Sequence, residues 1–266
     1  MRVTPRTAVP SALLATTVLL AGCASTPPSA DVRTTPAARA STTPSAVPAP
    51  TTIPAPTPTA EVEESASVVL DRLSVKGRSS MTGYERVHFG QPWLDADRNG
   101  CDTRNDMLNA HLTHLIHKHG TRDCVVLSGD LADPYTSRSI HFVRGDGFLV
   151  DIDHVVPLGN VWVTGGATWD IKKRAAIAND PLNLEPVDAS TNRQKGDGDA
   201  ATWLPPNKDF RCAYVARQVA VKDKYGLWVT PPEKKAIARL LARCPDEHVP
   251  ADSGAPTSVT LNIHEP

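Results

Sequence analysis

The fold is decided by residues 150–158, which read VDIDHVVPL. A strand ends here in two carboxylates and a histidine, and Pro157 closes it. Asp153 and His154 are adjacent, so on a regular strand their side chains would point to opposite faces. In an irregular segment leaving the strand, one side chain can hold a cation while the other faces a substrate. We interpret Asp151 as a carboxylate that faces solvent or supports the site from behind.

The segments around this stretch predict one globular domain over residues 62–245, followed by a polar, loose tail over residues 246–266. Residues 140–150 (IHFVRGDGFLV) predict a hairpin with a Gly-Asp-Gly turn at 145–147. Apolar spacing predicts helices over 62–75, 103–118, 168–178, 212–225 and 231–243. We expect Gly226 to cap the fourth of these helices and Pro231 to open the last.

Asparagine-rich segments follow downstream, with NDPLNL at residues 179–184 and NRQKG at residues 192–196. Asparagine is a weak helix and strand former but bonds nearby backbone groups well, and its amide oxygen suits hard cations. Together with VDIDHVVPL, these segments resemble the HNH (ββα-metal) nucleases, and closely the secreted bacterial HNH-type proteins with a D-x-D-H-x-V-P-L box. The resemblance covers about residues 85–245 and also takes in residues 101–106, Trp169, residues 178–180, Asp197, residues 203–206 and Tyr214.

The resemblance implies an α+β fold with a ββα-metal core, embedded in a mainly helical domain that disulfides pin together. It also implies one role for each matched residue. His154 matches the general base that activates water, and Asp153 matches the acidic metal ligand before it. Asn183 matches the residue that braces the loop holding the histidine, and Asn192 matches the third position, a metal ligand. The long insert between His154 and Asn183 departs from the compact HNH core.

These residue types suit the hydrolysis of a phosphodiester. A neutral imidazole near pH 7 can take the proton of the attacking water. One carboxylate, one amide oxygen and several waters form a typical shell for a single Mg²⁺ or Mn²⁺ ion, which neutralises charge on the phosphate and the leaving oxygen. Arg104, Arg193 and Lys195 are candidate phosphate contacts. We therefore expect a metal-dependent endonuclease, with DNA favoured by the resemblance and with no obligate protein partner.

The first 61 residues are not expected to belong to the folded domain. Residues 1–23 have a positive start at Arg2 and Arg6, then an apolar stretch over 12–21 that is too short to span a bilayer. The stretch ends in Leu-Ala-Gly-Cys at 20–23, which resembles the bacterial lipobox and implies a lipid anchor on Cys23, holding the exported protein on the outer face of the cell membrane. An ordinary signal peptide is the alternative. Residues 24–61 are rich in Pro, Ser, Thr and Ala, as in an extended tether.

The chain has five cysteines, so one of them has no partner for a disulfide. Assigning Cys23 to the lipid anchor accounts for this one. In an exported protein the other four are expected to form two disulfides. The sequence allows three connectivities, of which we favour Cys101–Cys124 and Cys212–Cys244, because the second pair would join two adjacent helices. Structural zinc is disfavoured because the chain has no C-x-x-C spacing.

Charge leaves a second function open. Residues 1–60 hold four of the 28 Lys and Arg residues but one of the 29 Asp and Glu residues, so the remainder carries 24 basic and 28 acidic side chains. A nonspecific nuclease usually presents a basic groove. Residues 95–106 (DADRNGCDTRND) also match part of a calcium loop, although a turn rich in helix-capping residues explains them as well. The alternative is therefore a non-catalytic envelope lipoprotein that binds calcium or a surface polymer.

Overall fold

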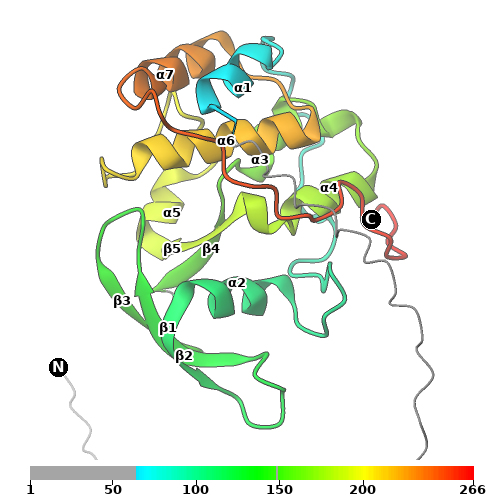
Figure 1. Ribbon diagram of the computed structural model, residues 1–266. Helices are drawn as coiled ribbons and strands as arrows, with labels where there is room; N and C mark the ends of the chain where they lie inside the picture. The colour runs from blue at the N-terminus through cyan, green and yellow to red at the C-terminus, as the bar shows by residue number, and fades with distance from the viewer. Residues whose placement is uncertain (1–63, 148) are drawn as a thin grey trace, which may run out of the picture. The chain divides into compact units, whose positions relative to one another are not determined.

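A computed structural model describes residues 64–147 and 149–266 of the 266-residue chain (Figure 1). The predicted signal peptide, Cys23 and the whole predicted tether lie outside the described residues. Within the described part of the chain, no helix is both long enough and apolar enough to cross a membrane.

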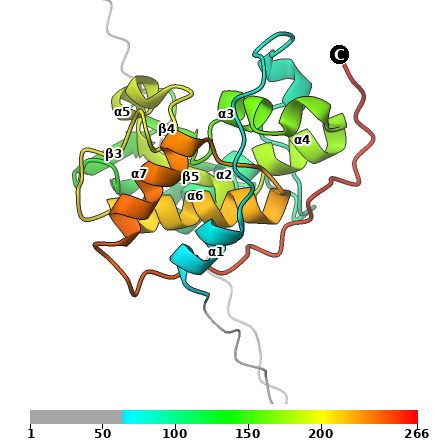
Figure 2. The same ribbon diagram turned by 90° about the horizontal axis from the view of Figure 1, so that it is seen from above.

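Three helices form one layer of the domain (Figures 1 and 2). They are α1 (Ala66–Arg72), α6 (Arg211–Tyr225) and α7 (Pro231–Leu241). Their shared core contains Val69, Val215, Val219 and Ile237, each at most 1% exposed. Gly226 ends α6 in the left-handed region at a φ of 70°, and Pro231 opens α7, as expected.

The expected disulfide between Cys212 and Cys244 is present, with a Cα–Cα distance of 6.5 Å. It joins the beginning of α6 to the segment that follows α7. The three helices are thus held together by an apolar core and by one covalent link.

An antiparallel three-stranded sheet and one helix form the opposite side of the fold. Helix α2 (Thr103–His111) leads directly into β1 (Leu112–His117), which pairs with β2 (Val126–Ala132), and β2 pairs with β3 (Ser139–Val143). The predicted helix over 103–118 is therefore wrong beyond His111. Leu112, Leu115 and Ile116 do fall at helical intervals, but they do not form one buried face, because Leu112 is buried and Ile116 is 59% exposed. Pairing with β2 fixes these residues as a strand instead.

A second sheet has only two strands, β4 (Val150–His154) and β5 (Leu184–Asp188), paired antiparallel with His154 opposite Leu184. Helix α5 (Ala189–Lys195) follows β5 immediately. The predicted 140–150 hairpin is wrong, because β3 pairs with β2 and β4 pairs with the distant β5. Gly145 and Gly147 do have positive φ values, as in a turn, but this turn connects two different sheets.

The segment between β4 and β5 is a mostly buried helical insert. It contains α3 (Leu158–Val163), the 3₁₀ turn η2 (Gly166–Thr168), α4 (Ile171–Ala178) and the 3₁₀ turn η3 (Pro181–Asn183). The insert packs with Phe89 of another 3₁₀ turn, η1 (Arg86–Phe89), and with Tyr225 at the end of α6. The insert thus packs on α6, whereas Val187 of β5 belongs to the core of the helical layer itself. Strands β4 and β5 pair although they are distant in sequence.

Most residues of the expected loose tail, 246–266, are exposed and have no regular secondary structure, but a few of them contact the domain. Val259 is 4% exposed and belongs to the core around the insert, and its amide donates to the Lys172 carbonyl. Glu265 forms an ion pair with Arg174 of α4. Together these contacts hold the tail along α4 (Figure 1).

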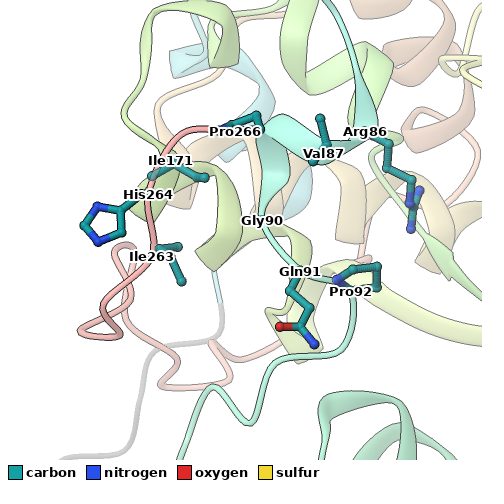
Figure 3. A pocket seen from close by; sticks show the side chains of 9 residues that line it. All are labelled: Arg86, Val87, Gly90, Gln91, Pro92, Ile171, Ile263, His264 and Pro266. Carbon is teal, nitrogen blue, oxygen red and sulfur yellow. The ribbon is translucent and has the colours of Figure 1, made fainter.

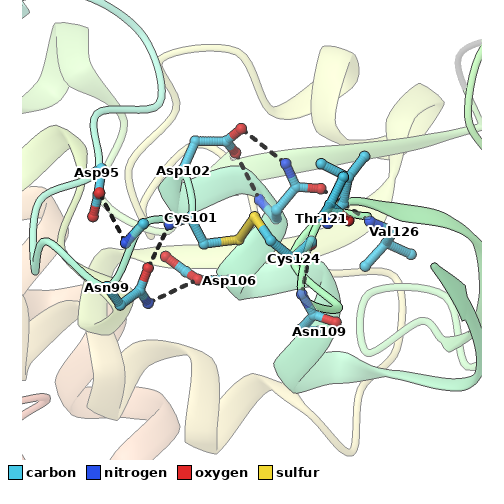
Figure 4. The surroundings of a disulfide bond; sticks show 12 residues. Asp95, Asn99, Cys101, Asp102, Asp106, Asn109, Thr121, Cys124 and Val126 are labelled. Carbon is cyan, nitrogen blue, oxygen red and sulfur yellow. Dashed lines mark hydrogen bonds between the residues drawn. A yellow bond between two sulfur atoms is a disulfide. The ribbon is translucent and has the colours of Figure 1, made fainter. Parts of the chain in front are cut away.

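The second expected disulfide, Cys101–Cys124, ties the loop before α2 to the β1–β2 connection (Figure 4). In this loop the acidic side chains accept bonds from the loop itself: Asp95 from the Gly100 amide, and Asp102 from the Asn105 amide at the start of α2. These are the bonds of a turn and a helix cap, which is the simpler of the two interpretations of residues 95–106.

Candidate active site

A cleft of about 360 Å³ opens beside β4 and the beginning of the helical insert. It brings together four residues that the sequence singles out, Arg104, Asp153, His154 and Asn192. The complete lining is Tyr84, Arg86, Trp93, Arg104, Asp151, Ile152, Asp153, His154, Pro157, Leu158, Asn192, Gly196 and Asp197. The cleft is thus built from strand β4, helix α2, helix α5 and the segment 84–93.

His154 is the last residue of β4 and is only 6% exposed. Its Nε2 lies 3.0 Å from the Ala178 carbonyl oxygen. A carbonyl can only accept a hydrogen bond, so Nε2 carries the proton and Nδ1 keeps a free lone pair. Burial, aided by the nearby positive charge of Arg86, lowers the pKa of His154 to about 3. The imidazole is therefore neutral at pH 7 and holds the tautomer in which Nδ1 can accept a proton.

Asp153 is 4% exposed and is held at one of its two carboxylate oxygens. The Tyr135 hydroxyl donates to Oδ2 at 2.5 Å, and the Lys195 ammonium also donates to Oδ2, at 2.5 Å. No donor in residues 64–147 or 149–266 bonds the other oxygen, Oδ1. Burial raises the pKa of Asp153 and lowers the pKa of Lys195, and the ion pair between them opposes both shifts.

Lys195 does not lie where a phosphate could reach it, unlike the contact expected from the sequence. Its ammonium is fully buried and donates to the His154 carbonyl at 2.6 Å in addition to Asp153. Helix α5 ends at Lys195 and points its side chain under β4, where the Asp153 carboxylate and the His154 carbonyl satisfy an ammonium that burial removes from water.

Asn183 is fully buried beneath the cleft and bonds the chain that leaves His154. Its Oδ1 accepts from the Val156 amide at 2.8 Å, and its Nδ2 donates to the carbonyls of Val156 and Ile177. Its backbone carbonyl accepts from the Val155 amide. The side chain therefore fixes both the exit of β4 and the end of α4, whose Ala178 carbonyl orients His154.

Asn192 and Asp197 supply oxygen atoms on the α5 side of the cleft. Asp197 lies against Gly159 at the start of α3, and its Oδ1 accepts from the Gly159 amide at 3.2 Å. A Cβ at position 159 would lie 2.4 Å from the Asp197 carboxyl carbon, so any other residue there would displace this carboxylate.

The oxygen donors of the cleft fit a hard divalent cation, because they are carboxylate and amide oxygens and include no sulfur. Elsewhere in the described residues, Cys212, Cys244 and Glu247 lie close enough to share an ion. The two sulfur atoms form a disulfide, however, and offer no thiolate to a metal.

Two arginines give the cleft local positive charge. Arg86 and Arg104 both line it, and Arg104 lies 5.8 Å from the ring centroid of Trp93. The Trp93 ring is in turn parallel to His154, with 6.4 Å between centroids. Arg193 lies outside the lining, 61% exposed and 3.8 Å from Asp151. The cleft therefore combines two guanidinium groups with three carboxylates, two of which are already paired, Asp153 with Lys195 and Asp151 with Arg193.

A separate hollow of about 500 Å³ lies between the 86–92 segment and the C-terminal tail (Figure 3). Arg86 borders both this hollow and the cleft. Its other walls include Val87, Ile171 and Ile263, so the surface is mainly apolar. It contains none of the residues that the sequence singles out.

Three lining residues, Tyr84, Arg86 and Trp93, have no signal in the sequence, and a fourth, Asp197, belongs to the resemblance without a role of its own. The position of Asp197 directly after the 192–196 segment is the signal that points to it. The other three come from residues 84–93, which have neither regular periodicity nor a motif. Only the tertiary fold brings this segment to β4.

Comparison with known proteins identifies the family of the chain. Residues 102–240 match the family model described as GmrSD restriction endonucleases, C-terminal domain. An uncharacterized secreted protein of Arthroderma benhamiae is 34% identical over 182 residues, which cover 68% of this chain and 85% of the relative. This relative is fungal, so the similarity is not restricted to bacterial proteins. No solved structure matches the chain.

Proposed function

The chain belongs to the family of GmrSD restriction endonuclease C-terminal domains, and on this premise we propose that it is a metal-dependent HNH-type endonuclease that acts outside the cell. The favoured substrate is DNA. The observation that carries the proposal is His154, a buried, neutral imidazole with a free Nδ1, in one cleft with Asp153 and Asn192.

The order of elements around the cleft supports the HNH assignment. Strands β4 and β5 pair antiparallel and α5 follows at once, which is the ββα order that the resemblance implies. His154 then lies on the first strand and Asn192 on the helix. The helical insert separates the two strands in sequence without preventing their pairing.

The reaction we propose begins with removal of a proton from water by His154. Nδ1 accepts the proton, while Nε2 stays bonded to Ala178 and keeps the ring oriented. The positive charge of Arg86 contributes to the low pKa of the free site. A substrate phosphate bound at Arg86 offsets that charge and makes His154 a stronger base, so proton transfer is coupled to substrate binding.

The remaining cleft residues hold the reacting groups. Asp153 and Asn192 would hold the divalent cation through one carboxylate oxygen and one amide oxygen. When bound, this ion neutralises the charge that develops on the phosphate and on the leaving oxygen. Arg86 and Arg104 bind the phosphates on either side of the scissile bond, which places positive charge locally although the folded part carries more acidic than basic residues.

Action outside the cell is supported by two observations. Both disulfides require an oxidising compartment, which the cytosol does not provide. The fungal relative is named a secreted protein. We retain the lipid anchor on Cys23 as part of the proposal, with the Pro-rich tether separating the domain from the membrane.

The direct test is cleavage of plasmid DNA by the soluble chain from residue 24 onward, with Mg²⁺ or Mn²⁺ and with EDTA. We expect metal-dependent nicking that His154→Ala abolishes, while His119→Ala, which changes an exposed histidine, cleaves normally. Single-stranded RNA and DNA are tested in parallel. If the wild-type protein cleaves none of them with either metal, the nuclease proposal fails and the non-catalytic binding protein becomes the better interpretation.

A further inference from the structure

We propose that Tyr135 and Lys195 are positioning residues that set the metal preference of the site, because they occupy one oxygen of Asp153 and leave only the other for the cation. The inference rests on the proposed function, since it takes Asp153 as a metal ligand. It predicts a site that prefers Mg²⁺ or Mn²⁺ to Ca²⁺, and it assigns that preference to two residues outside the metal shell.

The two donors converge on the same atom. The Tyr135 hydroxyl and the Lys195 ammonium each lie 2.5 Å from Oδ2 of Asp153. A carboxylate oxygen offers about two lone-pair sites, so two donors saturate it. Oδ1 has no protein donor in the described part of the chain, and Asp153 lines the cleft, so Oδ1 is the oxygen that can reach a cation.

Both donors are rigidly held. Tyr135 is fully buried, and its ring packs against Trp203, Phe210 and Tyr214 at centroid distances of 5.3, 6.0 and 5.7 Å. Lys195 is fixed by its second bond, to the His154 carbonyl. The carboxylate therefore cannot rotate to offer both oxygens without breaking two buried hydrogen bonds.

This restriction discriminates between cations by coordination chemistry. Ca²⁺ takes six to eight oxygen ligands in flexible geometry and often uses both oxygens of a carboxylate, whereas Mg²⁺ requires a compact octahedron and keeps several waters. A carboxylate that is limited to one oxygen favours the octahedral ion. The Lys195 charge acts in the same direction, because it offsets the Asp153 charge and so weakens sites that depend on many anionic ligands.

The test compares variants with matched controls on the metal-free soluble chain. Tyr135→Phe removes the hydroxyl donor, and Tyr214→Phe removes a neighbouring buried hydroxyl that bonds Gln218 and not Asp153. Lys195→Met removes the ammonium, and Lys222→Met removes another fully buried ammonium, paired with Glu233. Mn²⁺ affinity is read from the electron paramagnetic resonance signal of free Mn²⁺, Ca²⁺ affinity from competition, and folding from circular dichroism.

We expect the wild-type protein to bind Mn²⁺ more tightly than Ca²⁺, and we expect Tyr135→Phe to reduce this ratio about tenfold, within the 10–100-fold range typical of residues that support metal ligands. Lys195→Met is expected to reduce it at least as much. Both control variants should keep the wild-type ratio. A purely structural role would change the melting temperature of Tyr135→Phe and leave the ratio unaltered.

The inference is overturned if a folded Tyr135→Phe protein keeps the wild-type ratio, if Tyr214→Phe changes it equally, or if the wild-type chain prefers Ca²⁺. Lys195→Met can fail to fold, and Tyr135→Phe then decides the outcome alone. Cleavage of DNA is measured separately. Metal-dependent cleavage with an unchanged ratio defeats only this inference, whereas a shifted ratio without any cleavage defeats only the nuclease proposal.

Discussion

The low pKa of His154 predicts a loss of stability in acid that a single substitution removes. Burial holds the pKa at about 3 in the native, metal-free protein, compared with the ordinary value of 6.5 in an unfolded chain. Above pH 6.5 the imidazole is neutral in both the native and the unfolded state, so its contribution to the free energy of unfolding does not change with pH. As the pH falls below 6.5 the unfolded chain binds a proton that the native chain does not bind, and the native state loses stability until the pH approaches 3.

The size of the effect follows from these two pKa values. At pH 5 the unfolded imidazole is almost fully protonated, whereas the native imidazole is almost fully neutral. Relative to pH 7.5, the difference in proton binding corresponds to a loss of about 2 kcal/mol in the free energy of unfolding. The residue is only 6% exposed, so screening by solvent reduces this value little.

The assay is urea unfolding of the soluble chain at pH 7.5 and at pH 5.0, with EDTA in both buffers. The free energy lost between the two pH values is compared for wild type, His154→Gln and His119→Gln, the last being exposed on the β1–β2 connection. All other titrating groups contribute alike to the three proteins. We expect His154→Gln to lose about 2 kcal/mol less than the other two. Equal losses in all three would refute a neutral, buried His154.

Three further predictions address the surroundings of the site. Gly159→Ala places a Cβ against Asp197 and should lower kcat in the plasmid assay without lowering the melting temperature by more than a few degrees; full activity would show that Asp197 can shift freely. Arg86→Ala should reduce the slope of log Kobs against log salt for DNA binding in EDTA by about 1, and an unchanged slope would remove Arg86 from the phosphate contacts. Replacing Cys212 and Cys244 with Ala opens a loop of 32 residues and should cost about 4 kcal/mol in urea unfolding, a value that a cost near zero would contradict.

The sequence predicts the parts of the site that are local along the chain. The end of β4 near His154 and the two disulfides follow from short patterns and from chemistry, whereas α5, which carries Asn192, follows only from the HNH resemblance. The insert between β4 and β5 does not separate Asp153 and His154 from Asn192 in space, because two strands can pair whatever the length of chain between them. Asp153, His154 and Asn192 line one cleft, as the HNH resemblance predicts.

Other features depend on contacts that no local pattern records. The Gly-Asp-Gly turn predicts that β3 pairs with β4, but β4 pairs with β5, which follows the insert. Lysine side chains usually lie on the surface, but the Lys195 side chain is buried and forms an ion pair with the buried Asp153 carboxylate. Arg86 reaches the cleft from a segment without periodicity. In each case long-range packing overrides the local preference.

The contacts of Val259 and Glu265 with the domain have a consequence for the timing of folding. Val259 completes the core around the insert, and Glu265 pairs with Arg174, whose side chain also holds the carbonyls of His88 and Trp169. The part of the domain that carries the 84–93 segment thus depends on residues that are much later in the sequence. A growing chain lacks those contacts until residues 259–265 have been synthesised, so the cleft cannot reach its final form when its own residues leave the ribosome.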